Sequence, residues 1–260
     1  MKARADMRAG RQRLDLLLVK RGLVQSRQRA LALILAGDVL VNDQRMSKAG
    51  TFVPEDASIR ITGRDMPYVS RGGLKLEAAL RTFKIDVSGL RCLDVGASTG
   101  GFTDCLLQHG ATNVTAVDVG YGQLHWKLRS DPRVRVLERT NIRYLDTQIL
   151  DREADLACID VSFISLKIVV PAVLRFVKEP YPIICLIKPQ FEVGKGLVGK
   201  GGVVRDPPLH QAVIEDVTAS LEKLRLRRLG ITPSPILGPK GNQEYLAYFE
   251  AGLCDPRSNK

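Results

Sequence analysis

The sequence predicts an α/β protein with a mostly parallel sheet, preceded by a small α+β module at the amino terminus. Its 260 residues exceed the length of one average domain, roughly 150 residues, so a large and a small domain are expected. After residue 69, short apolar runs alternate with helical patterns, which is typical of a parallel sheet covered on both faces. Residues 1–35 hold nine Lys or Arg against two Asp or Glu, so the small module has a basic character of its own.

The amino-terminal module shows the signals of two helices followed by strands. A short leucine-rich helix is predicted from Leu14 to a stop signal at Gly22. A second helix is predicted between an N-cap at Ser26 and a carboxyl-terminal glycine, Gly37. Strand-like residues then flank an Asn-Asp turn, and residues 58–62 alternate as a half-buried strand.

We expect a domain boundary in G-R-D-M-P-Y, where Gly and Pro lie between a predicted strand and the next helical pattern. The expected parts are the module over residues 1–62, a linker over 63–68, a large domain over 69–252 and a tail over 253–260. The strands expected in the large domain cover residues 91–95, 114–118, 134–137, 156–160, 183–188 and 245–249. In open sheets of this class, ligands bind beyond the carboxyl ends of the strands.

The first of these strands ends in L-D-V-G-A-S-T-G-G-F-T, a glycine-rich turn ahead of a predicted helix. A dinucleotide fingerprint reads G-x-G-x-x-G, whereas this turn reads G-x-x-x-G-G, with Ser98 in place of the second glycine. An acid before the turn, Asp94, and another after the next strand, Asp118, favour S-adenosylmethionine, since the second acid can accept ribose hydroxyls. The alternative interpretation is that the glycines only permit tight packing. The residues expected to bind the cofactor are Asp94, Gly96, Ala97, Ser98, Thr99, Gly100, Gly101, Phe102, Asp118 and Asn141.

Four charged residues occupy positions that solvated surface residues rarely take. Lys188 ends the most apolar strand, Asp160 ends the strand before it, and Glu244 begins the last strand. Lys75 lies in S-R-G-G-L-K-L at the start of the large domain. Because strand ends converge in this fold, we expect these residues to form a common catalytic site. The alternative for each residue is an ion pair at the rim of the sheet.

The strings R-L-D-L-L-L-V-K-R-G-L-V-Q-S-R-Q-R-A and I-L-A-G-D-V-L-V-N resemble the αL RNA-binding motif of S4-type domains. The resemblance implies that the basic face of the module binds structured RNA through its phosphates, as shape-based recognition of double-stranded RNA requires. The residues concerned are Arg13, Lys20, Arg21, Arg27 and Arg29. Alternatively, these side chains form a solvated face without a partner.

The large domain resembles the FtsJ-like ribose 2′-O-methyltransferases, whose K-D-K-E tetrad matches Lys75, Asp160, Lys188 and Glu244. With the strings G-A-S-T-G-G-F-T, D-V-S-F-I-S-L and K-P-Q-F-E-V-G-K-G added, roughly residues 13–250 resemble the TlyA family. The resemblance implies a Rossmann-like class I methyltransferase fold that uses S-adenosylmethionine. It further implies 2′-O-methylation of cytidine ribose in ribosomal RNA, with free RNA or ribosomal subunits as partners.

Within this tetrad, Lys188 is our candidate for the base that accepts the proton of the ribose hydroxyl. Burial, Lys75 and the sulfonium favour the neutral amine, whereas Asp160 and Glu244 favour the ammonium form. Two roles for Lys188 therefore stay open: it is the base, or it only orients the hydroxyl.

Functions other than methyl transfer could also account for the positive net charge of the chain. The net charge of +11 would suit anionic lipid as well as nucleic acid, and the family also carries the label haemolysin. However, no broad apolar helix face and no secretory signal are evident, so we expect a cytoplasmic protein without a membrane partner. An RNA-binding protein without catalysis is a further alternative, which the intact tetrad disfavours. The five cysteines and three histidines are too scattered to predict a metal site.

Overall fold

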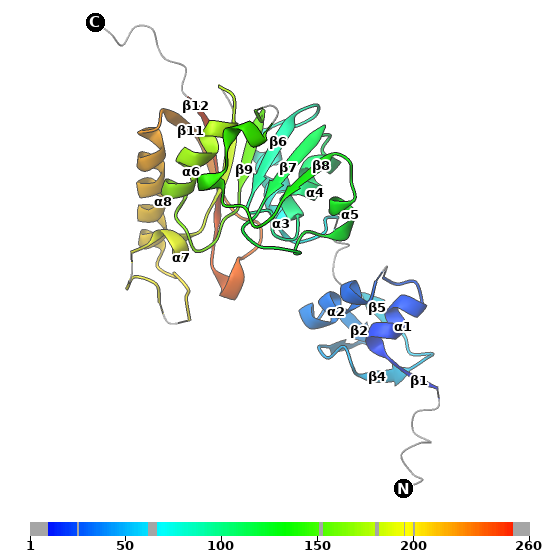
Figure 1. The fold of residues 1–260 in the computed structure, drawn as a ribbon. Helices are drawn as coiled ribbons and strands as arrows, with labels where there is room; N and C mark the ends of the chain where they lie inside the picture. Colours follow the sequence, from blue (N-terminus) through cyan, green and yellow to red (C-terminus); the bar gives the residue numbers. More distant parts are fainter. Residues whose placement is uncertain are drawn as a thin grey trace, which may run out of the picture. The chain divides into compact units, whose positions relative to one another are not determined.

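The computed structural model describes residues 10–24, 26–61, 67–150, 153–179, 182–194, 196–199 and 201–251. The chain forms two compact units, Met1–Met66 and Pro67–Lys260 (Figure 1). Most of the expected linker and all of the expected tail lie outside the described residues.

The amino-terminal unit contains both predicted helices and the predicted hairpin. Its elements are β1 (Arg11–Arg13), α1 (Leu14–Lys20), α2 (Arg27–Ala36), β2 (Val39–Val41), β3 (Gln44–Met46), β4 (Phe52–Pro54) and β5 (Ile59–Ile61). The side chain of Ser26 accepts a hydrogen bond from the backbone N–H of Arg29 and so caps α2, which ends at Gly37 with a φ of 75°. Asn42 and Asp43 both have positive φ angles, as a two-residue hairpin turn between β2 and β3 requires.

A buried carboxylate stands at the centre of the amino-terminal unit. Leucines of α1 pack against α2 and β2 in one core, and Asp15 of α1 is as fully buried as they are. Its Oδ1 accepts a hydrogen bond of 3.0 Å from Arg13, and its Oδ2 accepts one of 2.8 Å from Arg27. These hydrogen bonds lower the pKa of Asp15 from 3.8 to about 2, with the hydrogen bond from Arg13 as the largest cause. The pairing of β1 with β4 was not predicted.

The large unit is an α/β layered structure. Its helices are α3 (Gly72–Phe83), α4 (Gly101–Gln108), α5 (Trp126–Arg129), α6 (Leu166–Val173), α7 (Pro189–Glu192) and α8 (Pro207–Glu222), with short 3-10 turns η2 (Ile142–Tyr144), η3 (Thr147–Ile149), η4 (Leu174–Phe176) and η5 (Pro239–Gly241). Its strands are β6 (Arg91–Val95), β7 (Asn113–Val117), β8 (Val134–Leu137), β9 (Leu156–Ile159), β10 (Ile183–Ile187), β11 (Leu226–Pro233) and β12 (Tyr245–Ala251).

The seven strands form one sheet in the order β11-β12-β10-β9-β6-β7-β8. The five strands from β10 to β8 pair in parallel, whereas β12 is antiparallel to both β10 and β11. This confirms the prediction of a mostly parallel sheet. The strand β11 was not predicted, because it is an edge strand whose arginines are exposed and which lacks a clear apolar pattern.

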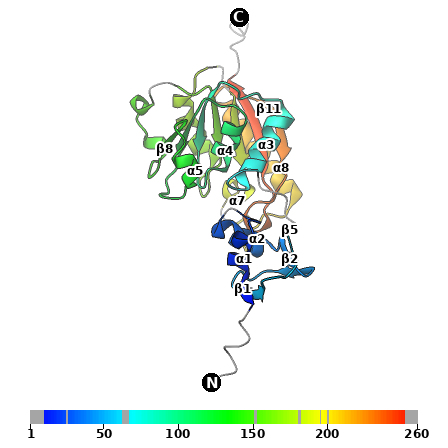
Figure 2. The same cartoon turned by 90° about the vertical axis from the view of Figure 1, so that its right-hand side faces the viewer.

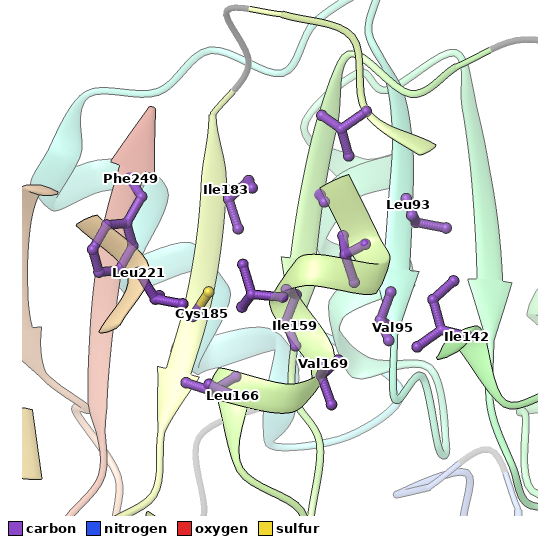
Figure 3. Close-up of a cluster of buried hydrophobic side chains, with 14 of the residues drawn as sticks. Leu93, Val95, Ile142, Ile159, Leu166, Val169, Ile183, Cys185, Leu221 and Phe249 are labelled. Carbon is purple, nitrogen blue, oxygen red and sulfur yellow. The ribbon is translucent and has the colours of Figure 1, made fainter. Parts of the chain in front are cut away.

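Helices cover both faces of this sheet. On one face α6 and α8 pack against alternate strand residues, and Figure 3 shows Ile159 of β9 near Leu166 of α6, with Leu221 of α8 in the same cluster. On the other face α3, α4 and α5 form a second core, and Figure 2 turns these helices toward the viewer. Both faces of β9 and β10 are therefore fully buried. Among the described helices, none is long and apolar enough to cross a membrane.

We predict that Asp15→Asn destabilises the amino-terminal unit by roughly 1–3 kcal/mol, because the buried side chain no longer makes charge-assisted hydrogen bonds with two arginines. A carboxyl whose folded pKa is lowered from 3.8 to about 2 contributes stability above its unfolded value and loses it as the pH falls. Protection of the α1 and α2 amides in hydrogen exchange should therefore decline between about pH 4 and pH 2 in the wild type. This acid-dependent decline should be smaller in Asp15→Asn.

The matched control is Asp43→Asn, since the Asp43 side chain is 86% exposed in its ion pair with Arg60. An equal loss of amide protection in both variants would contradict a central role for Asp15.

Candidate active site

The four residues of the expected tetrad lie together at one edge of the sheet. Asp160 and Lys188 directly follow the carboxyl ends of the parallel strands β9 and β10. Glu244 directly precedes β12, whose amino end lies beside the carboxyl end of β10 because these two strands are antiparallel. Lys75 comes from the first turns of α3. All four side chains line one cavity of about 350 Å³, here called the tetrad cavity.

The tetrad forms two ion pairs. Nζ of Lys188 lies 2.5 Å from Oδ1 of Asp160, and Nζ of Lys75 lies 2.5 Å from Oε2 of Glu244. The lysine side chains are only 8% and 10% exposed, and the side chain of Glu244 is fully buried. Charges withdrawn from water in this way are costly unless they are paired. Each lysine therefore compensates the carboxylate beside it.

Two neutral side chains extend the tetrad. Lys188 donates a hydrogen bond of 3.0 Å from Nζ to Oγ of Ser162. Gln190 donates one of 3.4 Å from Nε2 to Oε1 of Glu244. A Cβ at Gly238 would collide with the carboxylate of Glu244, so only glycine lets this wall of the cavity approach so closely.

A second cavity of about 380 Å³ begins on the other side of the glycine-rich turn and is here called the Asp118 cavity. Asp118, which follows β7, accepts hydrogen bonds from the backbone N–H of Ser98 at 2.7 Å and of Gly120 at 2.6 Å. Asn141 also lines this cavity, and its side-chain oxygen accepts from the backbone N–H of Arg143 at 3.1 Å. Both cavities share the lining residues Gly96, Ser98, Asp160 and Ser162.

The glycine-rich turn is divided between the two cavities and the core. Residues 96–99 together with Gly101 and Phe102 line the tetrad cavity. A Cβ at Gly96 would strike the backbone carbonyl of Asp160, so this glycine allows the turn to lie against the end of β9. At Gly100, φ is 94° and the side chains of Leu124 and Leu128 occupy the place of a Cβ. Gly100 therefore fits the alternative interpretation, in which the glycine only permits tight packing, and Gly100 lines neither cavity.

Asp94 also lies outside the two cavity linings, although it was expected to bind the cofactor. It is fully buried beneath the turn, where Oδ2 accepts a hydrogen bond of 2.6 Å from Oγ1 of Thr103 in α4. Its Oδ1 has no hydrogen-bond partner among the described residues. Burial raises the pKa of Asp94 to about 7, against the opposing effect of the Thr103 hydrogen bond.

The basic residues expected to contact RNA lie on the amino-terminal unit, and most of them are held by internal contacts. Arg13 and Arg27 bind Asp15, and Lys20 pairs with Glu55 at 3.0 Å. Arg21 donates hydrogen bonds to backbone carbonyl oxygens of the loop after β4, and Arg29 is partly exposed on α2. The side chains of Arg13 and Arg27 are 38% and 55% exposed, so they remain accessible.

Three side chains at the site received no role from the sequence patterns. Ser162 and Phe163 belong to D-V-S-F-I-S-L, and Gln190 belongs to K-P-Q-F-E. Phe163 has a φ of 63°, is 90% exposed, and its ring lies 4.8 Å from that of Phe191. Their position in the sequence could have indicated a role at the site, since each of the three lies within three residues of Asp160 or Lys188.

Comparison with known proteins gives matches over both units. The S4 domain model matches residues 12–59, and the FtsJ-like methyltransferase model matches residues 68–251. The chain is 48% identical over 242 residues to the 16S/23S rRNA (cytidine-2′-O)-methyltransferase TlyA of Mycobacterium tuberculosis, covering 93% of this chain and 90% of that protein. It is 44% identical over 244 residues to YqxC of Bacillus subtilis, a candidate rRNA methyltransferase, covering 94% of this chain and 87% of that protein.

A solved structure is similar over the same extent. It is that of a candidate hemolysin from Streptococcus thermophilus, which shares 42% identity and a TM-score of 0.75, covering 94% of this chain and 89% of that one. The FtsJ-like model alone spans more than half of the chain, and the similarity to TlyA continues through the S4 domain. The chain therefore belongs to the TlyA family of FtsJ-like methyltransferases.

Proposed function

We propose that this protein transfers the methyl group of S-adenosylmethionine to the ribose 2′-hydroxyl of a cytidine in ribosomal RNA. The observation that carries the proposal is the tetrad, in which Lys75, Asp160, Lys188 and Glu244 line one cavity next to a second cavity that contains Asp118. The choice of cytidine and of ribosomal RNA rests on the related TlyA enzyme. A similar structure is named a hemolysin, but that name does not identify any residue of this chain that would carry such an activity.

The Asp118 cavity fits S-adenosylmethionine in size and chemistry. Small-molecule sites have volumes of roughly 300–1,000 Å³, are mostly apolar and hold a few fixed polar groups. Each carboxylate oxygen of Asp118 accepts one backbone hydrogen bond and keeps a second lone pair for a ribose hydroxyl. Val119, Ile142 and Phe163 add apolar surface to the lining. When bound, S-adenosylmethionine supplies a methyl group on a positively charged sulfur.

The tetrad would act on the ribose hydroxyl in the neighbouring cavity. A hydroxyl is a weak nucleophile, so the enzyme has to align it and accept its proton as the new carbon–oxygen bond forms. We assign the acceptance of this proton to Nζ of Lys188, which first has to lose its own proton to solvent and become a neutral amine. The carboxylate of Asp160 at 2.5 Å then stabilises the ammonium group that results. Lys75 and Glu244 line the same cavity and offer a donor and an acceptor for other oxygens of the nucleotide.

The S4 domain would supply most of the affinity for RNA. Residues 1–62 carry twelve Lys or Arg against six Asp or Glu and contain no tetrad residue. Lysine and arginine neutralise phosphates and release condensed cations, which makes such binding strongly dependent on salt. A ribosomal RNA substrate, free or within a subunit, would place the protein in the cytoplasm.

We predict that the protein labels a cytidine ribose when it is incubated with labelled S-adenosylmethionine and ribosomal subunits, and that Lys188→Ala abolishes this labelling. The variant should bind S-adenosylmethionine within about twofold of the wild type, because Lys188 acts on the hydroxyl and not on the cofactor. The readout is the position of the 2′-O-methyl group together with calorimetric binding.

Lys223→Ala is a matched control, because Lys223 is an exposed lysine of the same unit beyond α8. Turnover of Lys188→Ala close to that of the wild type would remove Lys188 from the mechanism. Methylation of a base in place of a ribose would refute the proposed reaction.

We predict that Asp118→Ala weakens S-adenosylmethionine binding by roughly 10- to 100-fold in calorimetry, because the ribose hydroxyls no longer have a charged acceptor. Asp118→Asn, which keeps one acceptor oxygen, should give an intermediate loss. The exposed Asp43→Ala serves as the control for removal of a carboxylate. A protein that binds NAD but not S-adenosylmethionine would contradict the assignment of this cavity.

We predict that Arg27→Ala combined with Arg29→Ala weakens binding to ribosomal RNA and lowers the slope of log affinity against log salt by roughly one for each phosphate that is no longer neutralised. Cofactor affinity should stay unchanged. The control is Lys223→Ala with Arg227→Ala, which removes the same charge from exposed positions of the large unit. If both double variants weakened binding and lowered the slope equally, total charge and not the S4 domain would govern binding.

A further inference from the structure

The junction between the two cavities contains a serine that is not part of the tetrad. Ser162 follows Asp160 by two residues, and its side chain is among the few that line both the tetrad cavity and the Asp118 cavity. A group transferred from a cofactor in one cavity to a nucleotide in the other has to pass this junction. Ser162 therefore lies where the reacting groups would meet.

The hydrogen-bond geometry of Lys188 points to the same serine. Nζ of Lys188 donates to Oγ of Ser162 at 3.0 Å. Asp160 is nearer, with Oδ1 at 2.5 Å from Nζ. Hydrogen bonds are directional, so these two contacts together orient the amine. Asp160 supplies the compensating charge, and Ser162 holds an N–H toward the junction of the two cavities.

We propose that Ser162 is a positioning residue for methyl transfer, which fixes the rotation of the Lys188 amine about its terminal bond. This proposal rests on the proposed function. With one N–H directed to Ser162 and another toward Asp160, the neutral amine keeps its lone pair for a ribose hydroxyl in the tetrad cavity, which Lys188 lines. As that hydroxyl oxygen bonds to the methyl carbon, the carbon–sulfur bond breaks and the hydroxyl proton passes to Nζ.

A positioning role requires that Ser162 influence the rate and not the assembly of the site. Ser162 is an exposed residue, so removal of its hydroxyl takes away little buried surface, and Lys188 keeps its charged partner Asp160. The Lys188–Asp160 ion pair does not depend on it. The folded structure and the charge balance of the tetrad are therefore expected to survive Ser162→Ala.

The experiment compares Ser162→Ala with Ser162→Thr in the full-length protein, using ribosomal subunits and labelled S-adenosylmethionine. In Ser162→Ala the Lys188 amine is no longer oriented by a hydroxyl, so kcat should fall by about 10-fold or more, as expected when a hydrogen bond to a charged group is removed. The KM for S-adenosylmethionine and its calorimetric Kd should change by less than about twofold. Ser162→Thr keeps the hydroxyl and should recover most of the rate.

Ser130→Ala is the matched control, because Ser130 is an exposed serine at the end of α5 that lines neither cavity. A wild-type kcat in Ser162→Ala would overturn the proposal, and so would an equal loss in Ser162→Thr or a loss confined to cofactor affinity. If the wild-type protein itself methylated no ribosomal RNA, the proposed function would fail. An active wild type with an unaffected Ser162→Ala would remove only the positioning role.

Discussion

Antiparallel pairing of β12 with β10 is the constraint on which the candidate site depends. In the register of these strands, Ile187 at the end of β10 stands opposite Tyr245 at the start of β12. The next residue on one strand is Lys188, and the preceding residue on the other is Glu244, so two charged side chains from distant parts of the sequence meet at one edge. If β12 ran parallel to β10, Glu244 would lie at the opposite edge, roughly 16 Å away for strands of this length. Among the described strands of this sheet, β12 alone runs opposite to the others, and it is the strand that brings the second carboxylate to the tetrad.

The same edge combines buried charge with access to ligands. Parallel strands covered by helices on both faces leave only their ends for polar side chains, and the two lysines there are mostly withdrawn from water. Each lysine is paired with a carboxylate, which offsets the cost of this burial. The close packing at Gly96 and Gly238 brings backbone up to this edge without adding charge, and Gly96 lines both cavities whereas Gly238 lines the tetrad cavity.

The amino-terminal unit uses a buried carboxylate for a different purpose. Asp15 holds Arg13 and Arg27 in defined positions while both arginines stay partly exposed. An arginine has five N–H donors, so the hydrogen bonds to Asp15 leave others free for phosphate oxygens. Fixing these side chains before RNA binds reduces the entropy that binding would otherwise cost. In both units, then, a carboxylate with little exposure holds cationic groups in place, and the proposed roles of these groups are to act on a hydroxyl in one case and on phosphates in the other.

Much of this could be predicted from the sequence, because the relevant signals are local. Ser26 and Gly37 delimit α2 through contacts within a few residues, and the apolar runs of β9 and β10 reflect burial on both faces. Motif spacing and family resemblance named the tetrad residues. The edge strand β11 was missed because its exposed arginines hide the apolar pattern. The sequence also left open which charges pair. Lys188 contacts Asp160 because the sheet order places β10 beside β9, and Lys75 contacts Glu244 because α3 lies against β12. That order arises from pairing between segments far apart in the chain, about which local propensity carries no information.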